Sequence, residues 1–183
     1  MQNCRQNNWR KRRFAYAKDF GCGTVLLENK PSPNHSRSLW VALLIGACLM
    51  AGIDEIVFHQ LLAWHHFYDQ STPAIGLLSD GLLHAAELIG LVAGFFMYAD
   101  LRRSHSLAPR RAWAGFFMGM GGFQIFDGIV DHKLLRVHQV RYGVDNLFIY
   151  DLLWNLGGLI LLLIGVWLLV KARSATAPQQ ANT

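Results

Sequence analysis

Carboxylate and imidazole side chains recur inside the most apolar parts of this chain of 183 residues. The stretch from residue 123 to 138, FQIFDGIVDHKLLRVH, begins in an apolar run and carries Gln124, Asp127, Asp131 and His138. At about 100° per residue these four side chains fall within roughly 60° of one another on a helix. Ionisable groups on a helix of membrane length are costly, so by default they indicate a functional site.

Two other segments carry the same residue types. Asp80, His84 and Glu87 have the cleanest ligand spacing, because positions i, i+4 and i+7 share one face of a helix. Glu55 and His59, four residues apart, come next.

Carboxylate and imidazole ligands suit zinc, iron, copper or manganese. The sequence therefore predicts a site for a divalent transition metal (zinc, copper or iron). The predicted metal ligands are His59, His66, Asp80, His84, Glu87 and Asp131. Glu55 and Asp127 are predicted to act as catalytic carboxylates, because a metal-activated water needs a base beside it.

The remaining histidines are assigned lesser roles. His65 and His66 lie at the mouth of a helix, and at most one of them is expected to be a ligand. His132 is predicted to point about 100° away from Asp131 on a helix. His138 is taken to lie near or beyond the membrane surface.

Four apolar segments, residues 39–64, 74–99, 112–129 and 148–170, are each close to the ~20 residues that cross a bilayer. A soluble helical bundle would carry charges every three or four residues on its outer faces. Residues 157–170 carry none. We predict an all-α polytopic membrane protein, an antiparallel four-helix transmembrane bundle.

Residues 39–173 are predicted to form the transmembrane domain. Residues 1–38 are predicted to be a basic, disordered cytoplasmic arm, and residues 174–183 a flexible tail. Basic runs can bind nucleic acid, but a solvated tail is the simpler interpretation and no nucleic-acid partner is expected. The three cysteines are scattered, which indicates neither a disulfide framework nor a thiolate zinc site.

Polar residues come late in the first and third spans and early in the second and fourth. This alternation places nine of the twelve carboxylates and six of the eight histidines at one end of an up-down bundle. No repeated motif is expected. Fourteen of the seventeen Lys and Arg residues lie at the opposite end. Positive loops stay cytoplasmic, so both termini are predicted inside and the polar end is predicted to face the periplasm or cell exterior.

Three motif-rich stretches carry a resemblance: GIDEIVFHQLLAWHHFYD, SDGLLHA, and FQIFDGIVDHKLLRVHQVRYGVDN followed by YDLLWN. Together they resemble an uncharacterised bacterial membrane-protein family, domain of unknown function 2243, over about residues 39–170. The resemblance implies a four-span protein of the bacterial inner membrane. It also implies an association with assembly factors of caa3-type cytochrome oxidase, which favours copper or a respiratory role and assigns no ligand.

Four functions stay open at this point. The protein is a metalloenzyme acting on a small or membrane-associated substrate, a non-enzymatic metal (copper) carrier for respiratory oxidase assembly, a proton or ion transporter, or a bundle held by a structural polar network. The nearly bare cytoplasmic halves of the spans disfavour a continuous ion pathway. The chain lacks HExxH, GxSxG and the paired ExxH motifs of di-iron bundles.

Overall fold

The computed structural model describes residues 14–15, 27–28 and 31–174. The basic run at residues 10–13 and the tail from residue 175 onward lie outside the described residues, so the predictions for them stay predictions.

The chain divides into two compact units, Met1–Ser32 and Pro33–Thr183. In the first unit, the two-residue strand β1 (Phe14–Ala15) pairs antiparallel with β2 (Leu27–Glu28).

All of the regular secondary structure in the described part of the second unit is helical, and loops connect the helices. Its elements are α1 (His35–Asp54), the π-helix η2 (Glu55–Leu61), α2 (Pro73–Arg103), α3 (Pro109–Phe126), the π-helix η3 (Asp127–Leu134) and α4 (Leu147–Ser174). The prediction of an all-α body is confirmed. The first helix begins four residues before the predicted boundary, because the Asn34 side chain accepts a hydrogen bond from the backbone N–H of Arg37 and caps it.

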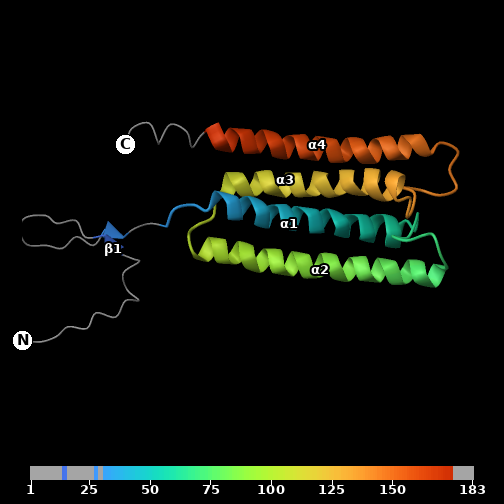
Figure 1. The fold of residues 1–183 in the computed structure, drawn as a ribbon, viewed down its shortest axis with the longest axis horizontal. Helices are drawn as coiled ribbons and strands as arrows, with labels where there is room; N and C mark the ends of the chain where they lie inside the picture. The colour runs from blue at the N-terminus through green and yellow to red at the C-terminus, as the bar shows by residue number, and fades with distance from the viewer. Residues whose placement is uncertain (1–13, 16–26, 29–30, 175–183) are drawn as a thin grey trace, which may run out of the picture. The chain divides into compact units, whose positions relative to one another are not determined.

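The helices of this unit lie in a row in the order α2, α1, α3, α4 (Figure 1). The inner helices α1 and α3 run in the same direction, and the outer helices α2 and α4 run back beside them. Each outer helix therefore has one helical neighbour and leaves much of its apolar surface exposed. Phe96 on α2 is 74% exposed and Leu153 on α4 is 61% exposed.

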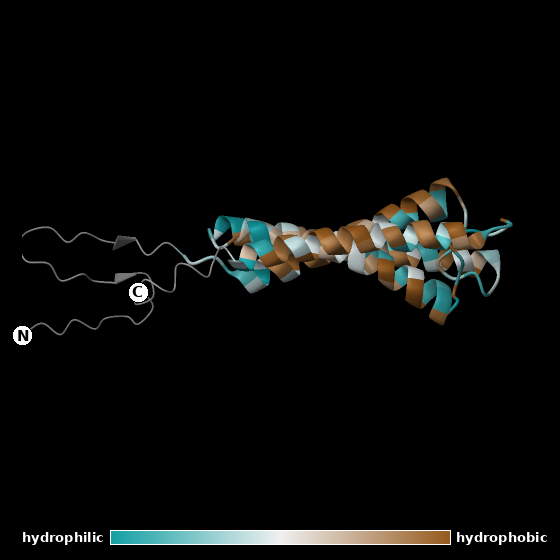
Figure 2. Cartoon of the chain, turned by 90° about the horizontal axis from the view of Figure 1, so that it is seen from above, coloured by the Kyte–Doolittle hydropathy of each residue, from teal (hydrophilic) through white to brown (hydrophobic). Residues whose placement is uncertain are grey.

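In the part of the chain that the structure describes, three helical segments are long and apolar enough to cross a membrane: His35–Leu61, Pro73–Arg103 and Leu147–Ser174. Figure 2 shows hydrophilic residues gathered toward the helix ends and apolar residues between them. Exposed apolar side chains on such helices are accounted for by contact with lipid. Fewer spans are established than the four predicted, because α3 is not among these three.

Glycines bring α1 and α3 into close contact. A Cβ atom added at Gly46 would collide with the carbonyl oxygen of Phe116 on α3, and one added at Gly119 would collide with that of Leu43 on α1. Small residues let helices approach at this range in a membrane. The α1–α3 pair is thus the closely packed centre of the row.

Both inner helices end in π-helical turns. The backbone N–H of Leu62 donates to the carbonyl of Val57, and that of Leu135 donates to Val130, each across five residues. In a π-helix, side chains five apart share a face, so the spacing of 100° per residue does not apply to η2 or η3. A helical wheel drawn at 100° per residue therefore places His132 on a different face from the carboxylates of its own segment, whereas in the structure His132 lies beside Asp127.

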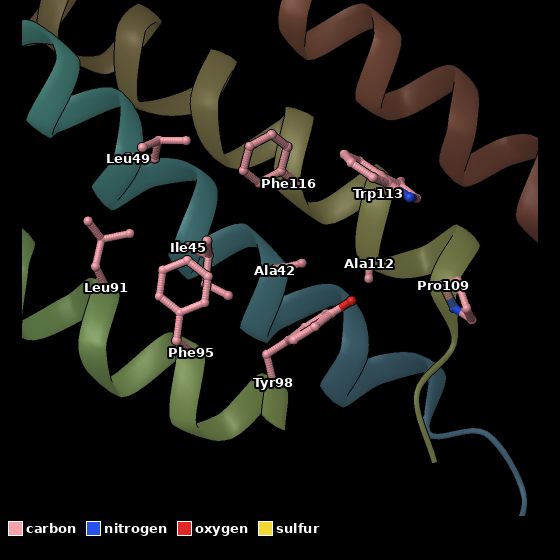
Figure 3. Close-up of a pocket in the computed structure, with 10 residues that line it drawn as sticks. All are labelled: Ala42, Ile45, Leu49, Leu91, Phe95, Tyr98, Pro109, Ala112, Trp113 and Phe116. Carbon is pink, nitrogen blue, oxygen red and sulfur yellow. The ribbon is translucent and has the colours of Figure 1, made fainter. Parts of the chain in front are cut away.

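A cavity of about 310 Å³ lies between α1, α2 and α3 near the arginine-rich end (Figure 3). Its lining is apolar and aromatic, with Ile45 on α1, Phe95 on α2 and Phe116 on α3. No carboxylate, histidine or cysteine lines it, so the ionisable chemistry of the described residues lies elsewhere.

Candidate metal centre

Buried ionisable residues gather where η2 and η3 end and where the two connecting loops pass over them. They are Asp54, Glu55, His59, His65, Asp80, Glu87, Asp127, Asp131, His132 and His138. Three groups among them bring candidate ligand atoms within 4.8 Å of one another: His59/His65/His138, Asp127/His132/His138 and Glu55/His59/Asp80.

A repeated motif supplies most of this cluster. The pattern DxIVxHxLLxxH occurs at residues 54–65 and again at residues 127–138, 73 positions later. The expectation that the chain contains no repeat is therefore wrong. The two copies differ at the intervening positions, and their locations at the ends of α1 and α3 make the correspondence visible in three dimensions.

The two copies make reciprocal contacts. His65 Nδ1 is hydrogen-bonded to the carbonyl oxygen of Val140 at 2.9 Å, and His138 Nδ1 to that of Phe67, also at 2.9 Å. Phe67 and Val140 are related by the same 73-residue offset. The rings of His65 and His138 stack with centroids 4.6 Å apart and planes 6° apart. A pseudo-twofold axis therefore passes close to these two rings. Each loop accepts a hydrogen bond from the histidine of the other loop.

The second copy forms a compact triad. Nε2 of His132 lies 2.8 Å from Nε2 of His138 and 3.2 Å from Oδ2 of Asp127. Nε2 of His138 lies 3.5 Å from Oδ1 of Asp127. Ligand atoms bound to one tetrahedral zinc at about 2.0–2.1 Å stand roughly 3.3 Å apart. The three side chains therefore already have the spacing of ligands that share an ion.

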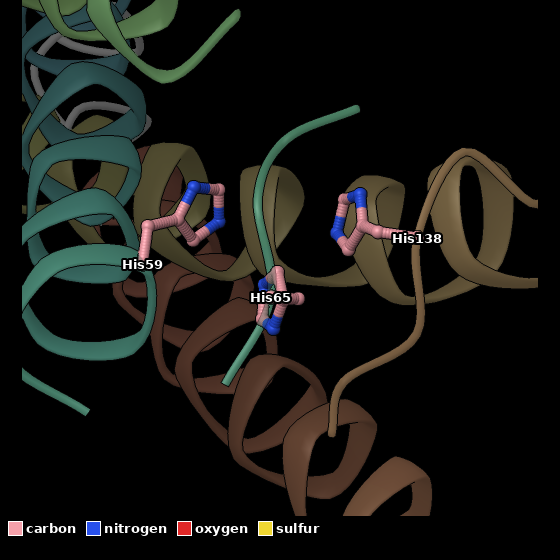
Figure 4. A group of neighbouring side chains, drawn as sticks. All are labelled: His59, His65 and His138. Atoms are coloured by element: carbon pink, nitrogen blue, oxygen red, sulfur yellow. The ribbon is translucent and has the colours of Figure 1, made fainter. Parts of the chain in front are cut away.

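The first copy has the same shape but is more open. The rings of His59 and His65 have centroids 4.5 Å apart and meet at 68°, as those of His132 and His138 meet at 4.5 Å and 78°. Nε2 of His59 lies 3.7 Å from Oδ2 of Asp54. Among the described residues, Nε2 of His59 and Nε2 of His65 are buried and have no hydrogen-bond partner. Figure 4 shows the rings of His59, His65 and His138 gathered from α1's end and the two loops.

Hydrogen bonding fixes which ring nitrogens are free to bind. A carbonyl oxygen only accepts, so Nδ1 of His65 and Nδ1 of His138 carry the proton, and Nε2 of each neutral ring keeps its lone pair. Burial, with the neighbouring imidazoles of His138 and His59, lowers the pKa of His65 to about 2. His65 is therefore neutral, which is the form that binds a metal.

Carboxylates hold the ring of His59. Its Nδ1 lies 2.9 Å from Oε2 of Glu55 and 3.0 Å from Oδ1 of Asp80. Metal-binding histidines commonly donate their second N–H to a carboxylate, which orients the ring and raises its basicity. Asp80 also contacts His66 Nδ1 at 2.6 Å through its other oxygen. The carboxylates of this side thus point at histidine nitrogens rather than at solvent.

The predicted site residues fall into different places. His59, Asp80, Glu55 and Asp127 all belong to the three groups of candidate ligands. His66 lies beside them on Asp80. His84 is 2.6 Å from Glu87 and its side chain is 43% exposed; Glu87 is buried, and neither residue belongs to the three groups.

Asp131 is buried but belongs to none of the three groups. Sequence reasoning missed three central residues, His65, His132 and His138. The signal that could have found them is the repeated motif, since each is related to another buried histidine by the 73-residue offset.

A second cavity, of about 430 Å³, is lined in part by Phe58 and Trp64 of the first copy of the motif. Its walls include Phe58, Trp64, Gln124, Val140 and Trp154, so it abuts the neighbours of His59 and His65 in sequence and the carbonyl that His65 binds. Trp154, which resembles a membrane-interface tryptophan in sequence, is only 9% exposed. In the described residues neither its Nε1 nor Oε1 of Gln124 has a hydrogen-bond partner.

Long apolar helices and a buried His/Asp/Glu cluster at one end define a helical membrane protein with a polar centre between two repeats. The chain belongs to the family described as predicted membrane protein (DUF2243), which matches residues 41–172. The resemblance in the motifs is thereby confirmed. No curated protein matches the chain, and no solved structure does.

Proposed function

We propose that this protein binds a transition-metal ion at the histidine cluster between the two copies of the motif. The observation that carries the proposal is the pair of histidines His65 and His138. The Nδ1 atom of each ring is hydrogen-bonded to a carbonyl oxygen of the other loop. The Nε2 atom of each ring, with its lone pair, therefore faces the buried cluster. Buried nitrogens of this kind need a proton donor or a metal.

The donor set favours zinc, copper or iron, because neutral imidazole suits these metals. In the absence of metal, one of the two nitrogens in the 2.8 Å contact between His132 Nε2 and His138 Nε2 has to carry a proton. Metal binding displaces such protons. Asp127 and Glu55 bring negative charge next to the imidazoles and offset the charge of the ion.

We further propose that α3 also crosses the membrane, which gives four spans, and that the cluster faces the periplasm of a bacterial inner membrane. The distribution of Lys and Arg supports this orientation, with both termini in the cytoplasm. The parallel course of α1 and α3 requires both helices to start on the same side.

The adjoining cavity favours a metalloenzyme over a carrier. An enzyme needs a cleft that brings substrate to the metal, whereas a carrier exposes its ligands. Here His59 and His138 are 3% and 1% exposed, and the cavity beside them is lined by aromatic and aliphatic side chains. The geometry suits an apolar substrate from the bilayer, with Trp154 N–H and the Gln124 carbonyl as its polar contacts. A bound metal would act as a Lewis acid on the substrate or on a bound water. Glu55 or Asp127 would act as the general base that accepts the proton which that group releases.

The decisive experiment is elemental analysis of protein purified without chelators. We expect His138→Ala to lower the bound metal at least tenfold, because it removes a ligand that two of the three groups share. His84→Ala, which alters an exposed histidine paired with Glu87, is the matched comparison and should retain more metal. A parent protein without stoichiometric zinc, copper or iron after metal supply would rule the proposal out.

A further inference from the structure

We propose that the centre holds two metal ions, one in each copy of the repeated motif. The first ion is bound by Asp54, His59 and His65, and the second by Asp127, His132 and His138. The ligand atoms of the second set all lie within 4.8 Å of one another, whereas the first set corresponds to it by the 73-residue offset and is more open. This inference rests on the proposed function, since it assigns the number of ions and the ligands of each.

Equivalent residues occupy equivalent positions in the two copies of the motif. Each triad consists of the first, sixth and last residues of DxIVxHxLLxxH. The histidine at the sixth position lies in a π-helix in both copies, and the aspartate five residues before it is the last residue of α1 in the first copy and the first residue of η3 in the second. Positions five apart share a face of a π-helix. The last follows a residue with positive φ, Ala63 at 48° or Arg136 at 53°. Each copy of the motif thus makes the same backbone turn, which brings its last histidine back beside the histidine at its sixth position.

Each copy keeps its own pair of rings. The centroids of His59 and His65 are 4.5 Å apart, as are those of His132 and His138. Rings from different copies are farther apart in the cross pairs, 5.9 Å for His59–His138 and 6.1 Å for His65–His132. Only the stacked pair on the pseudo-twofold axis, His65 and His138, is closer, with centroids 4.6 Å apart and planes 6° apart.

The first triad is left unsatisfied without an ion. The buried nitrogens His59 Nε2 and His65 Nε2 both lack a hydrogen-bond partner among the described residues, although these side chains are 3% and 6% exposed. An unpaired buried acceptor is costly. One ion in the second triad would leave these two nitrogens unchanged, whereas an ion in each triad satisfies both.

The two sites are not identical, because the flanking residues differ. Glu55 follows Asp54 in the first copy, and Gly128 takes the same place in the second. Asp80 reaches His59 Nδ1 on the first side. Asp151, the acidic residue near the start of α4, pairs with Lys133 instead. The first site therefore has more carboxylate charge and should differ in affinity from the second.

Titration of the purified, metal-stripped full chain with Co²⁺ tests the inference, because the visible absorption of Co²⁺ reports ligand geometry and stoichiometry together. We expect two equivalents per chain in the parent. The double variant Asp54→Asn/His59→Ala should bind one, and so should Asp127→Asn/His132→Ala. Asp151→Asn, which alters a carboxylate outside both triads, should still bind two.

A single equivalent in the parent, abolished by either double variant, would overturn the two-ion assignment and leave one shared ion. Binding of no Co²⁺ by the parent, together with no zinc, copper or iron by elemental analysis, would overturn the proposed function itself. Size-exclusion elution and helical circular dichroism equal to the parent's establish that the variants are folded. If the double variants do not fold, His59→Ala and His132→Ala are compared singly, and each should lose one equivalent only.

Discussion

At the scale of single residues, this cluster is organised by what each imidazole does with its Nδ1. His65 and His138 give that proton to carbonyl oxygens, and His59 gives it to Glu55 and Asp80. In all three rings the oxygen acceptor at Nδ1 fixes the orientation of the ring, and Nε2 therefore points into the cluster. This arrangement is typical of metal ligands, and it selects these histidines over exposed ones such as His84.

Removing the carboxylate behind a ligand tests this interpretation. We expect Asp80→Asn to weaken metal binding about 10–100-fold without changing the number of ions bound, because outer partners of ligating histidines have effects of that size. Competition with a chelator of known affinity measures the change. An affinity equal to the parent's would show that Asp80 does not orient His59. Asp100→Asn, at the other end of α2 where Asp100 pairs with Arg37, is the matched control.

The cavity beside the cluster gives a second test at this scale. Trp154→Phe keeps an aromatic ring but removes the unpaired N–H. We expect this variant to keep its metal and to bind an apolar, carbonyl-bearing probe such as a short-chain quinone several-fold more weakly, measured by quenching of tryptophan fluorescence in detergent. Trp113→Phe, at the arginine-rich end of α3, corrects for the lost fluorophore. Equal quinone affinity in the Trp154 and Trp113 variants would argue against a ligand contact at Trp154 Nε1.

At the scale of elements, the centre depends on how closely α1 and α3 approach. Gly46 and Gly119 are related by the 73-residue offset, and each faces a carbonyl oxygen of the other helix. The closest packing and the candidate metal centre therefore lie along the same helix pair. Separation of these helices would pull the two triads apart.

Gly119→Leu introduces a side chain where no space exists. We expect it to lower the free energy of unfolding by about 1–3 kcal/mol, the usual cost of overpacking, and to reduce metal occupancy as well. Thermal unfolding in detergent measures the first effect and elemental analysis the second. Gly122→Leu is the control on the same helix, because a Cβ at Gly122 meets nothing within 4 Å. Similar losses in the two variants would indicate that the contact at Gly119 is unimportant.

At the scale of the whole molecule, two helical hairpins with the same motif stand side by side, and the loop of each clamps a histidine of the other. Beyond the histidine hydrogen bonds, the backbone N–H of Asp69 donates to Val137, and Gln70 donates to the carbonyl of Arg136. Both loops therefore lie at the same end of the helical unit, opposite the end of α2 that carries Arg102 and Arg103.

Cysteine accessibility tests this topology. In a chain without native cysteines, Ser71→Cys should react with a membrane-impermeant maleimide in cells whose outer membrane alone is permeable. Ser104→Cys should react only after the inner membrane is opened. The reverse pattern would invert the proposed orientation, and labelling of both positions in intact spheroplasts would contradict the single crossing, by α2, that separates them.

Much of this arrangement could be predicted from composition and order along the chain. Apolar length predicts membrane helices because uncompensated polar backbone is excluded from lipid. The alternation of polar ends places Glu55, His59 and Asp80 at one level, and the structure brings these three together. These inferences need only the periodicity of a regular helix and the sign of the loop charges.

The tertiary structure decided which histidines converge. The π-helical turns change the angle between neighbouring side chains, so no wheel drawn at 100° per residue brings His132 to Asp127. His65 and His138 lie in loops, where sequence spacing carries no direction. Their Nδ1 atoms are held by hydrogen bonds to carbonyl oxygens more than seventy residues away. Long-range contacts of this kind exist only once both hairpins have packed. For that physical reason, the sequence contains the candidate ligand residues, and the tertiary structure determines which of them lie close together.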